Sequence, residues 1–100
     1  MDLRQSLIRM IRQLLEDMHI IQNQGAGYYT CTPFARRYNK LLIQARTLFL
    51  ADNTLIDTFE EMPELDPKDP SDKMKVIQSI RIESGQLIAL LESAQEDATP

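Results

Sequence analysis

The chain has 100 residues, of which 43% are hydrophobic and 26% are charged, with no tryptophan and only three glycines. A chain of this length forms one domain, residues 1–100, and its prominent Leu, Ile, Gln, Arg and Glu favour helices over strands. The formal net charge of −4 at pH 7 argues against general affinity for nucleic acids or anionic membranes.

The first predicted helix spans residues 2–24. Charged residues interrupt each apolar run, so this segment is neither a signal-peptide core nor a membrane span. Ile8 and Leu15 are seven residues apart beside the main apolar face, which predicts that the helix contacts two neighbours. The residues predicted to form its core face are Leu3, Leu7, Met10, Ile11, Leu14, Met18 and Ile21.

Residues 25–32 form the first predicted connection. Gly25 occupies the position of a left-handed helix cap. Tyr28 and Tyr29 are expected to cover the end of the bundle with their hydroxyl groups in water. The two nearby glycines follow a helix rather than a strand, so they do not predict a phosphate site.

Cys31 is the single cysteine, which excludes an internal disulfide framework and favours a reducing compartment, the cytoplasm. Cys31 and His19 flank the same connection, so a thiol-dependent enzyme with a thiolate–imidazole pair is one alternative function. The sequence offers no other catalytic constellation and indicates no cofactor or metal site.

A long central helix is predicted over residues 33–62. Thr32 followed by Pro33 is typical of a helix start, and Pro63 ends the pattern. The apolar positions follow a helical period and form an arc of roughly 140°. They are Phe34, Tyr38, Leu41, Leu42, Ala45, Leu48, Phe49, Leu55, Ile56 and Phe59.

Asp52 interrupts this apolar arc at a position that calls for a core residue. Either Asp52, Asn53 and Thr54 cap a break in the helix, or the helix continues and Asp52 is buried against a cation. In an antiparallel hairpin of the first two helices, Arg4 lies level with Asp52, so these two residues are the predicted structural ion pair.

Three prolines make residues 63–70 a stiff connection, after which a last helix is predicted over 71–96, followed by a frayed tail at 97–100. Asp66, Asp69 and Ser71 are its candidate N-caps. Ser84 and Gly85 interrupt its apolar face and predict close approach of another backbone. The other residues expected on that face are Met74, Ile77, Ile80, Leu87, Ile88, Leu91 and Ala94.

The predicted fold is therefore all-α: an antiparallel up-down-up three-helix bundle with a long central helix. Residues 1–46 carry seven Lys or Arg and three acidic residues, whereas 47–100 carry four and twelve. In this bundle the basic and acidic halves face one another and largely neutralise each other.

A nucleic-acid-associated protein is another alternative, because two aromatic residues accompany the basic cluster Arg36, Arg37 and Lys40. Phe34 and Tyr38 are expected to face the core, however. The up-down-up arrangement also gives the cluster acidic neighbours, which weakens the alternative. They are Glu92, Glu96 and Asp97.

Aliphatic pairs outside the predicted core faces favour a different function, a non-catalytic interaction or assembly module. Each pair lies on one side of a helix at a spacing of seven or eight residues, and such stripes become contacts. We expect a homo-oligomer, most simply a dimer, or docking onto a larger protein, with Ile43 and Leu50 as the first candidates. The full set is Ile8, Leu15, Ile43, Leu50, Ile82 and Leu90.

Overall fold

The computed structural model describes residues 2–24, 30–49 and 55–97. These residues form three α-helices and one short 3₁₀ turn, with no strand among them. In chain order they are α1 (Leu3–Asn23), α2 (Thr32–Arg46), η1 (Ile56–Thr58) and α3 (Pro70–Asp97). All three helices pack against one another, so the predicted all-α three-helix bundle is confirmed.

α1 begins and ends within one residue of the predicted span 2–24. The carboxylate of Asp2 accepts a hydrogen bond from the backbone N–H of Arg4 at 3.0 Å and caps the helix. Leu7, Ile11, Leu14 and Met18 are buried as predicted. Gly25, Tyr28 and Tyr29 lie outside the described residues.

The edge of the buried face of α1 differs from the prediction. Leu3 and Met10 are 43% and 45% exposed, whereas Ile8 is 6% exposed and belongs to the core. Because α1 packs on both α2 and α3, its buried surface extends to the Ile8 side.

α2 is half as long as predicted, since it ends at Arg46 rather than near residue 62. The backbone N–H groups of Thr47, Leu48 and Phe49 bond to carbonyls three residues earlier, which is 3₁₀ geometry that tightens and ends the helix. At the other end, Cys31 rather than Thr32 is the N-cap residue, and its carbonyl accepts from the N–H groups of Phe34 and Ala35.

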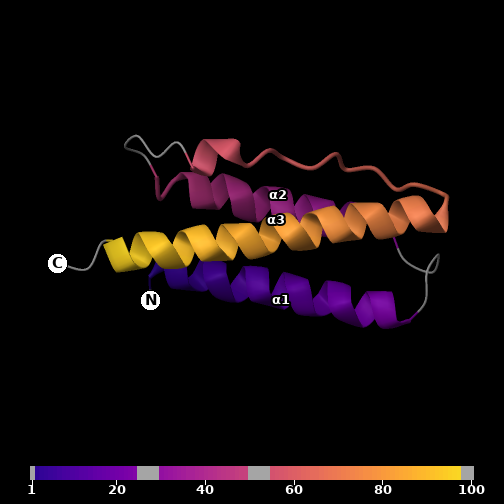
Figure 1. Ribbon diagram of the computed structural model, residues 1–100, viewed down its shortest axis with the longest axis horizontal. Coiled ribbons are helices and arrows are strands. Elements are labelled where there is room, and N and C mark those ends of the chain that lie inside the picture. Colours follow the sequence, from indigo (N-terminus) through magenta and orange to yellow (C-terminus); the bar gives the residue numbers. More distant parts are fainter. Residues whose placement is uncertain (1, 25–29, 50–54, 98–100) are drawn as a thin grey trace.

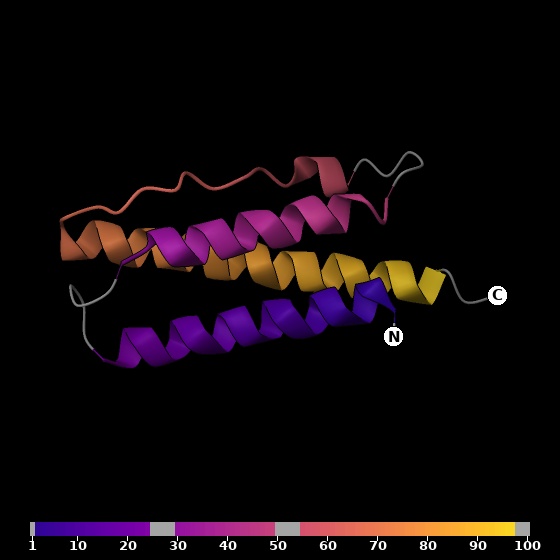
Figure 2. The same cartoon turned by 180° about the vertical axis from the view of Figure 1, so that it is seen from behind.

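Residues 59–69 form an extended segment, the strap, whose first four residues, 59–62, were predicted to be the end of the central helix. It runs back along α2, on the side away from α1, from the end of α2 to its beginning (Figures 1 and 2). α3 therefore starts beside the start of α2 and runs parallel to it. The predicted up-down-up order is wrong in its last step, because the proline-containing segment crosses the bundle instead of turning at one end.

α3 follows the predicted span 71–96 to within one residue at each end. Asp69 is its N-cap: the carboxylate accepts from the backbone N–H of Ser71 at 2.8 Å, with Pro70 at the first helical position. The tail predicted at 97–100 lies outside the described residues except for Asp97, the last residue of α3.

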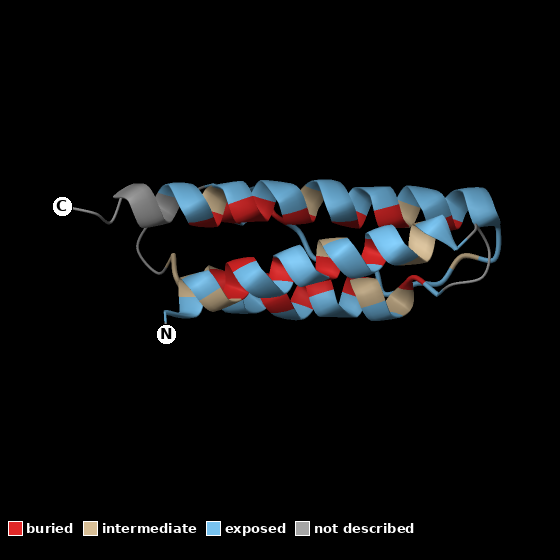
Figure 3. Cartoon of the chain, turned by 90° about the horizontal axis from the view of Figure 1, so that it is seen from below, coloured by how far each residue is buried: buried red, intermediate tan, exposed pale blue. Residues whose placement is uncertain are grey.

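The core lies between the three helices, and the buried residues occupy the sides that the helices turn toward one another (Figure 3). Ile56 of η1 and Phe59 of the strap also belong to this core. Tyr38 and Ser84 are fully buried, and their hydroxyl oxygens have no hydrogen-bond partner. Burial is also the main reason that the pKa of Tyr38 is raised far above its ordinary range.

Candidate interaction surface

The six predicted interface residues occupy different environments. Ile8 is buried, so it is not an interface residue. Ile43 is 47% exposed on α2, but its predicted companion Leu50 lies outside the described residues. Leu15 is half-buried and lines a shallow groove beside Ile82. Ile82 and Leu90 therefore remain as the one predicted pair that is described and not part of the core.

Between Gln78 and Ser93, a little over four helical turns, the side of α3 opposite the core carries no charged residue. On a helical wheel its residues fall within about 100°. All of them are exposed, and we call this set the α3 outer face: Gln78, Ser79, Ile82, Gln86, Ala89 and Ser93. Depletion of charge is typical of the centre of protein–protein interfaces.

The three most exposed large apolar side chains of the described residues lie on this face or beside it. Ile82 is 64% exposed and lies at its centre. Leu65 of the strap, 65% exposed, lines a groove of about 240 Å³ against Val76 and Ser79. Leu55, 59% exposed, lines a second groove farther along α3.

That second groove, the Leu90 groove, lies between η1 and the C-terminal half of α3 and has a volume of about 260 Å³. Its lining is mainly apolar, and two of the lining residues, Phe59 and Leu90, are largely withdrawn from solvent. Its lining residues are Leu55, Thr58, Phe59, Gln86, Ala89, Leu90 and Ser93. A groove of this size accommodates an aliphatic side chain from another molecule.

A polar stripe on α2 holds the strap in place. The guanidinium of Arg46 donates to the carbonyl of Phe59 at 3.0 Å. The buried amide of Asn39 donates to the carbonyl of Met62 at 2.8 Å and accepts from its N–H at 2.7 Å, as a neighbouring β-strand would. These roles of Arg46 and Asn39 have no local sequence signal, because their partners lie on a segment that was predicted to be helical.

One residue of the basic cluster predicted to bind nucleic acid, Arg36, is part of this polar stripe and bonds to the strap. Arg36 donates to the carboxylate of Glu64 at 3.1 Å. Hydrogen bonds from Arg36 and Asn39 lower the pKa of Glu64. The predicted neighbour Glu92 instead pairs with Arg12 of α1 at 3.0 Å, because α3 runs in the opposite direction to the one expected.

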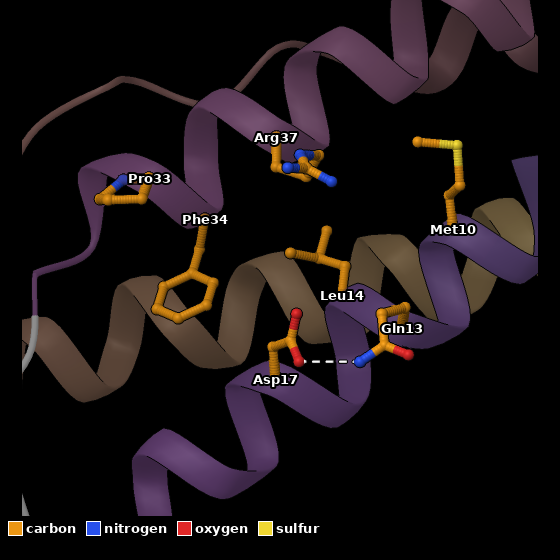
Figure 4. Close-up of a pocket in the computed structure, with 7 residues that line it drawn as sticks. All are labelled: Met10, Gln13, Leu14, Asp17, Pro33, Phe34 and Arg37. Atoms are coloured by element: carbon orange, nitrogen blue, oxygen red, sulfur yellow. Dashed lines mark hydrogen bonds between the residues drawn. The ribbon is translucent and has the colours of Figure 1, made fainter.

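Arg37 faces a groove of about 210 Å³ between α1 and α2 (Figure 4). Met10, Leu14 and Phe34 supply its apolar lining. On its α1 side, Gln13 donates to the carboxylate of Asp17 at 2.9 Å. The residues that line the groove include neither a nucleophile beside a base nor a set of metal ligands.

Cys31 and His19 have different partners. The Cys31 thiol is buried and lies 3.7 Å from the backbone carbonyl of Lys73, whereas His19 is exposed and its Nε2 lies 3.3 Å from the amide nitrogen of Asn23. Burial raises the pKa of the Cys31 thiol, which disfavours the thiolate that a nucleophile needs. The geometry therefore gives the predicted thiolate–imidazole pair no support.

Asp66 joins the starts of α2 and α3. Its carboxylate accepts from the backbone N–H of Cys31 at 3.1 Å and from Nζ of Lys73 at 2.8 Å. Asp66 was a candidate cap for the last helix, but it instead binds an N-terminal N–H of α2 from a position 35 residues away. Lys73 itself is 8% exposed, so this ion pair is partly shielded from water.

The predicted ion pair of Arg4 and Asp52 is not tested, because Asp52 lies outside the described residues. Within the described ranges, no cluster of three or more His, Cys, Asp or Glu residues could hold a metal ion. In the same ranges, none of the helices has both the length and the apolar character needed to cross a membrane.

The chain matches no protein-family model, and neither a curated protein nor a solved structure is significantly similar to it.

Proposed function

We propose that the protein is a non-catalytic assembly module that forms a homodimer through the α3 outer face. The observation that supports the proposal is the concentration of exposed apolar side chains beside an uncharged helix face, with Ile82 at its centre. A monomeric protein would expose these side chains to water at a cost of roughly 25 cal/mol per Å².

The α3 outer face is long enough for a specific contact. From Gln78 to Ser93 it extends about 22 Å along the helix axis. With the flanking strap and η1, it offers each subunit a contact surface at the small end of the range for stable dimers, on the order of 1,200 Å² in total. The single, buried cysteine is consistent with work in a reducing compartment, the cytoplasm.

Sedimentation over a range from low micromolar to several hundred micromolar tests this function. We expect the wild type to dimerise and Ile82→Lys to weaken the dimer at least about ten-fold, because a charge at the centre of the contact must be desolvated. The same substitution at Ile43, which is 47% exposed on α2, is the matched control and should leave the dimer unchanged.

Two results would contradict the proposal. A wild type that stays monomeric over the whole range would exclude self-association. A dimer that survives Ile82→Lys but dissociates in Ile43→Lys would place the contact on α2, as the sequence first suggests.

A further inference from the structure

The α3 outer face carries both a protruding side chain and a groove that fits it. Ile82 projects from the face with 64% of its surface exposed. The Leu90 groove opens on the same face, and the α3 residues that line it are Gln86, Ala89, Leu90 and Ser93. The centre of these four lies about 11 Å along the helix axis from Ile82. A knob and a hole on one face make that face complementary to itself.

We propose that the α3 helices of two copies pack antiparallel, so that Ile82 of each copy enters the Leu90 groove of the other. This inference rests on the self-association proposed above. A side chain that inserts among four residues of a facing helix is the knobs-into-holes arrangement of paired helices. One two-fold axis, passing beside Gln86, produces both insertions at once.

The sizes of the facing side chains favour this orientation. In the antiparallel pair the large Ile82 meets a wall that contains Ala89. Near the axis, Gly85 faces open space, since a Cβ added there would meet nothing within 4 Å. A parallel pair would instead place Ile82 against Ile82 and Ala89 against Ala89, leaving one level crowded and the other underfilled.

Charge complementarity favours the same orientation. Arg81 and Glu92 both lie on the flank of α3 toward α1, as their bonds to Gln22 and Arg12 show. A two-fold antiparallel pair brings these flanks together and sets Arg81 level with Glu92 of the second copy to within about 2 Å along the axis. In a parallel two-fold pair the α1-side flank of each copy would instead lie beside the opposite flank of the other copy, so the pairing of Arg81 with Glu92 is specific to the antiparallel arrangement.

Cysteine crosslinking distinguishes the two orientations. A disulfide requires Cα atoms within about 7 Å. Residue 86 lies next to its own equivalent across the axis, so Gln86→Cys should form an interchain disulfide when oxidised glutathione accepts the electrons. Residue 79 lies about 20 Å from its equivalent. Ser79→Cys should therefore not crosslink to itself, but should crosslink to Ser93→Cys when the two variants are mixed.

The control for these reactions is the wild type, whose Cys31 is fully buried and should stay reduced. A variant of the groove provides a second test. Ala89→Lys places a charge at the groove mouth and should weaken the dimer about ten-fold, as one central contact does. Because residue 89 is exposed, this change should leave the helix content unaltered.

Self-crosslinking of Ser79→Cys would overturn the antiparallel arrangement and indicate a parallel pair. If Ile82→Lys dissociates the dimer but Gln86→Cys does not crosslink and Ala89→Lys has no effect, the arrangement is wrong although the proposed function stands. A wild type that is monomeric throughout would overturn both.

Discussion

Ser84 and Gly85 are neighbours in α3 that face opposite environments. Ser84 is fully buried, as the sequence predicts from its place on the apolar face. Gly85 was expected to admit another backbone closely, but it is exposed and faces open space. Helical periodicity identifies which side of a helix is buried. It does not show whether a small residue at the edge of that side has a neighbour.

Replacing Gly85 by alanine should therefore stabilise the protein. The added methyl group meets no other atom, and alanine is preferred over glycine inside a helix by about 0.5 to 1 kcal/mol. Urea denaturation at a concentration where the protein is monomeric measures the change, with Ser79→Ala as an exposed control of smaller effect. A lower midpoint for Gly85→Ala would mean that the position has a neighbour or a non-helical backbone.

Other residues that were wrongly assigned to the core or to the surface lie at the edges of the buried helix faces. Met10 was assigned to the core, but it is 45% exposed. Ile8 was predicted to contact a second neighbouring helix, which its burial confirms, and also to belong to an interface, which is wrong. The two residues lie on opposite edges of the apolar face of α1. Which edge is buried depends on where the second neighbouring helix lies, and that is a property of the tertiary structure.

Among the elements, α1 and α3 could be predicted closely because an N-cap residue and a long apolar period specify each of them. The central helix could not, since the spacing of Ile56 and Phe59 fits two structures. Residues three apart share a side of an α-helix, but they also share a side of a 3₁₀ turn. In the protein a 3₁₀ turn followed by the strap buries both residues.

Asn39 is the residue on which the strap depends most. Asn39→Ala removes three hydrogen bonds, two of them to Met62, and leaves the N–H and the carbonyl of Met62 unpaired. We expect a loss of roughly 2 to 3 kcal/mol in the free energy of unfolding. The control, Arg36→Ala, breaks an ion pair whose side chains are 55% and 41% exposed and should cost less than about 1 kcal/mol. Equal losses in urea denaturation would contradict this ranking.

The contacts of Asp66 make stability depend on pH. The hydrogen bonds from Lys73 and from the N–H of Cys31 hold the pKa of Asp66 below its ordinary 3.8. The unfolded chain therefore binds the proton more readily. The stabilisation is complete above the ordinary pKa and is lost as the pH falls through the folded-state value.

Asp66→Asn tests this dependence. The wild type should be more stable than the variant near neutral pH, and the difference in the free energy of unfolding should shrink as the solution is acidified below the ordinary pKa. Urea denaturation at a series of pH values measures it. A difference that stays constant across the series would show that the carboxylate charge is not what holds the strap.

For the whole molecule, the sequence predicts that the basic first half and the acidic second half neutralise each other. The ion pairs of Arg12 with Glu92, Arg36 with Glu64 and Arg46 with Glu61 each join the two halves. This pattern does not reveal the direction of α3, because the strap supplies acidic partners to α2 directly. The prolines were taken to mark a turn, but an extended chain of 11 residues spans about 36 Å, enough to cross the bundle.

The strap is also a site where a protease can cut the chain between α2 and α3. Proteases bind their substrates as extended chains, and Glu60, Glu61 and Glu64 are exposed on this segment. A glutamate-specific protease should cut here before it cuts the helices, leaving one fragment with α1 and α2 and another with α3. Since α3 packs on both partners, the fragments should remain together in native gel filtration and separate only in denaturant. The protein thus consists of two parts, α1 with α2 and α3 alone, which pack against each other and are joined covalently by the strap.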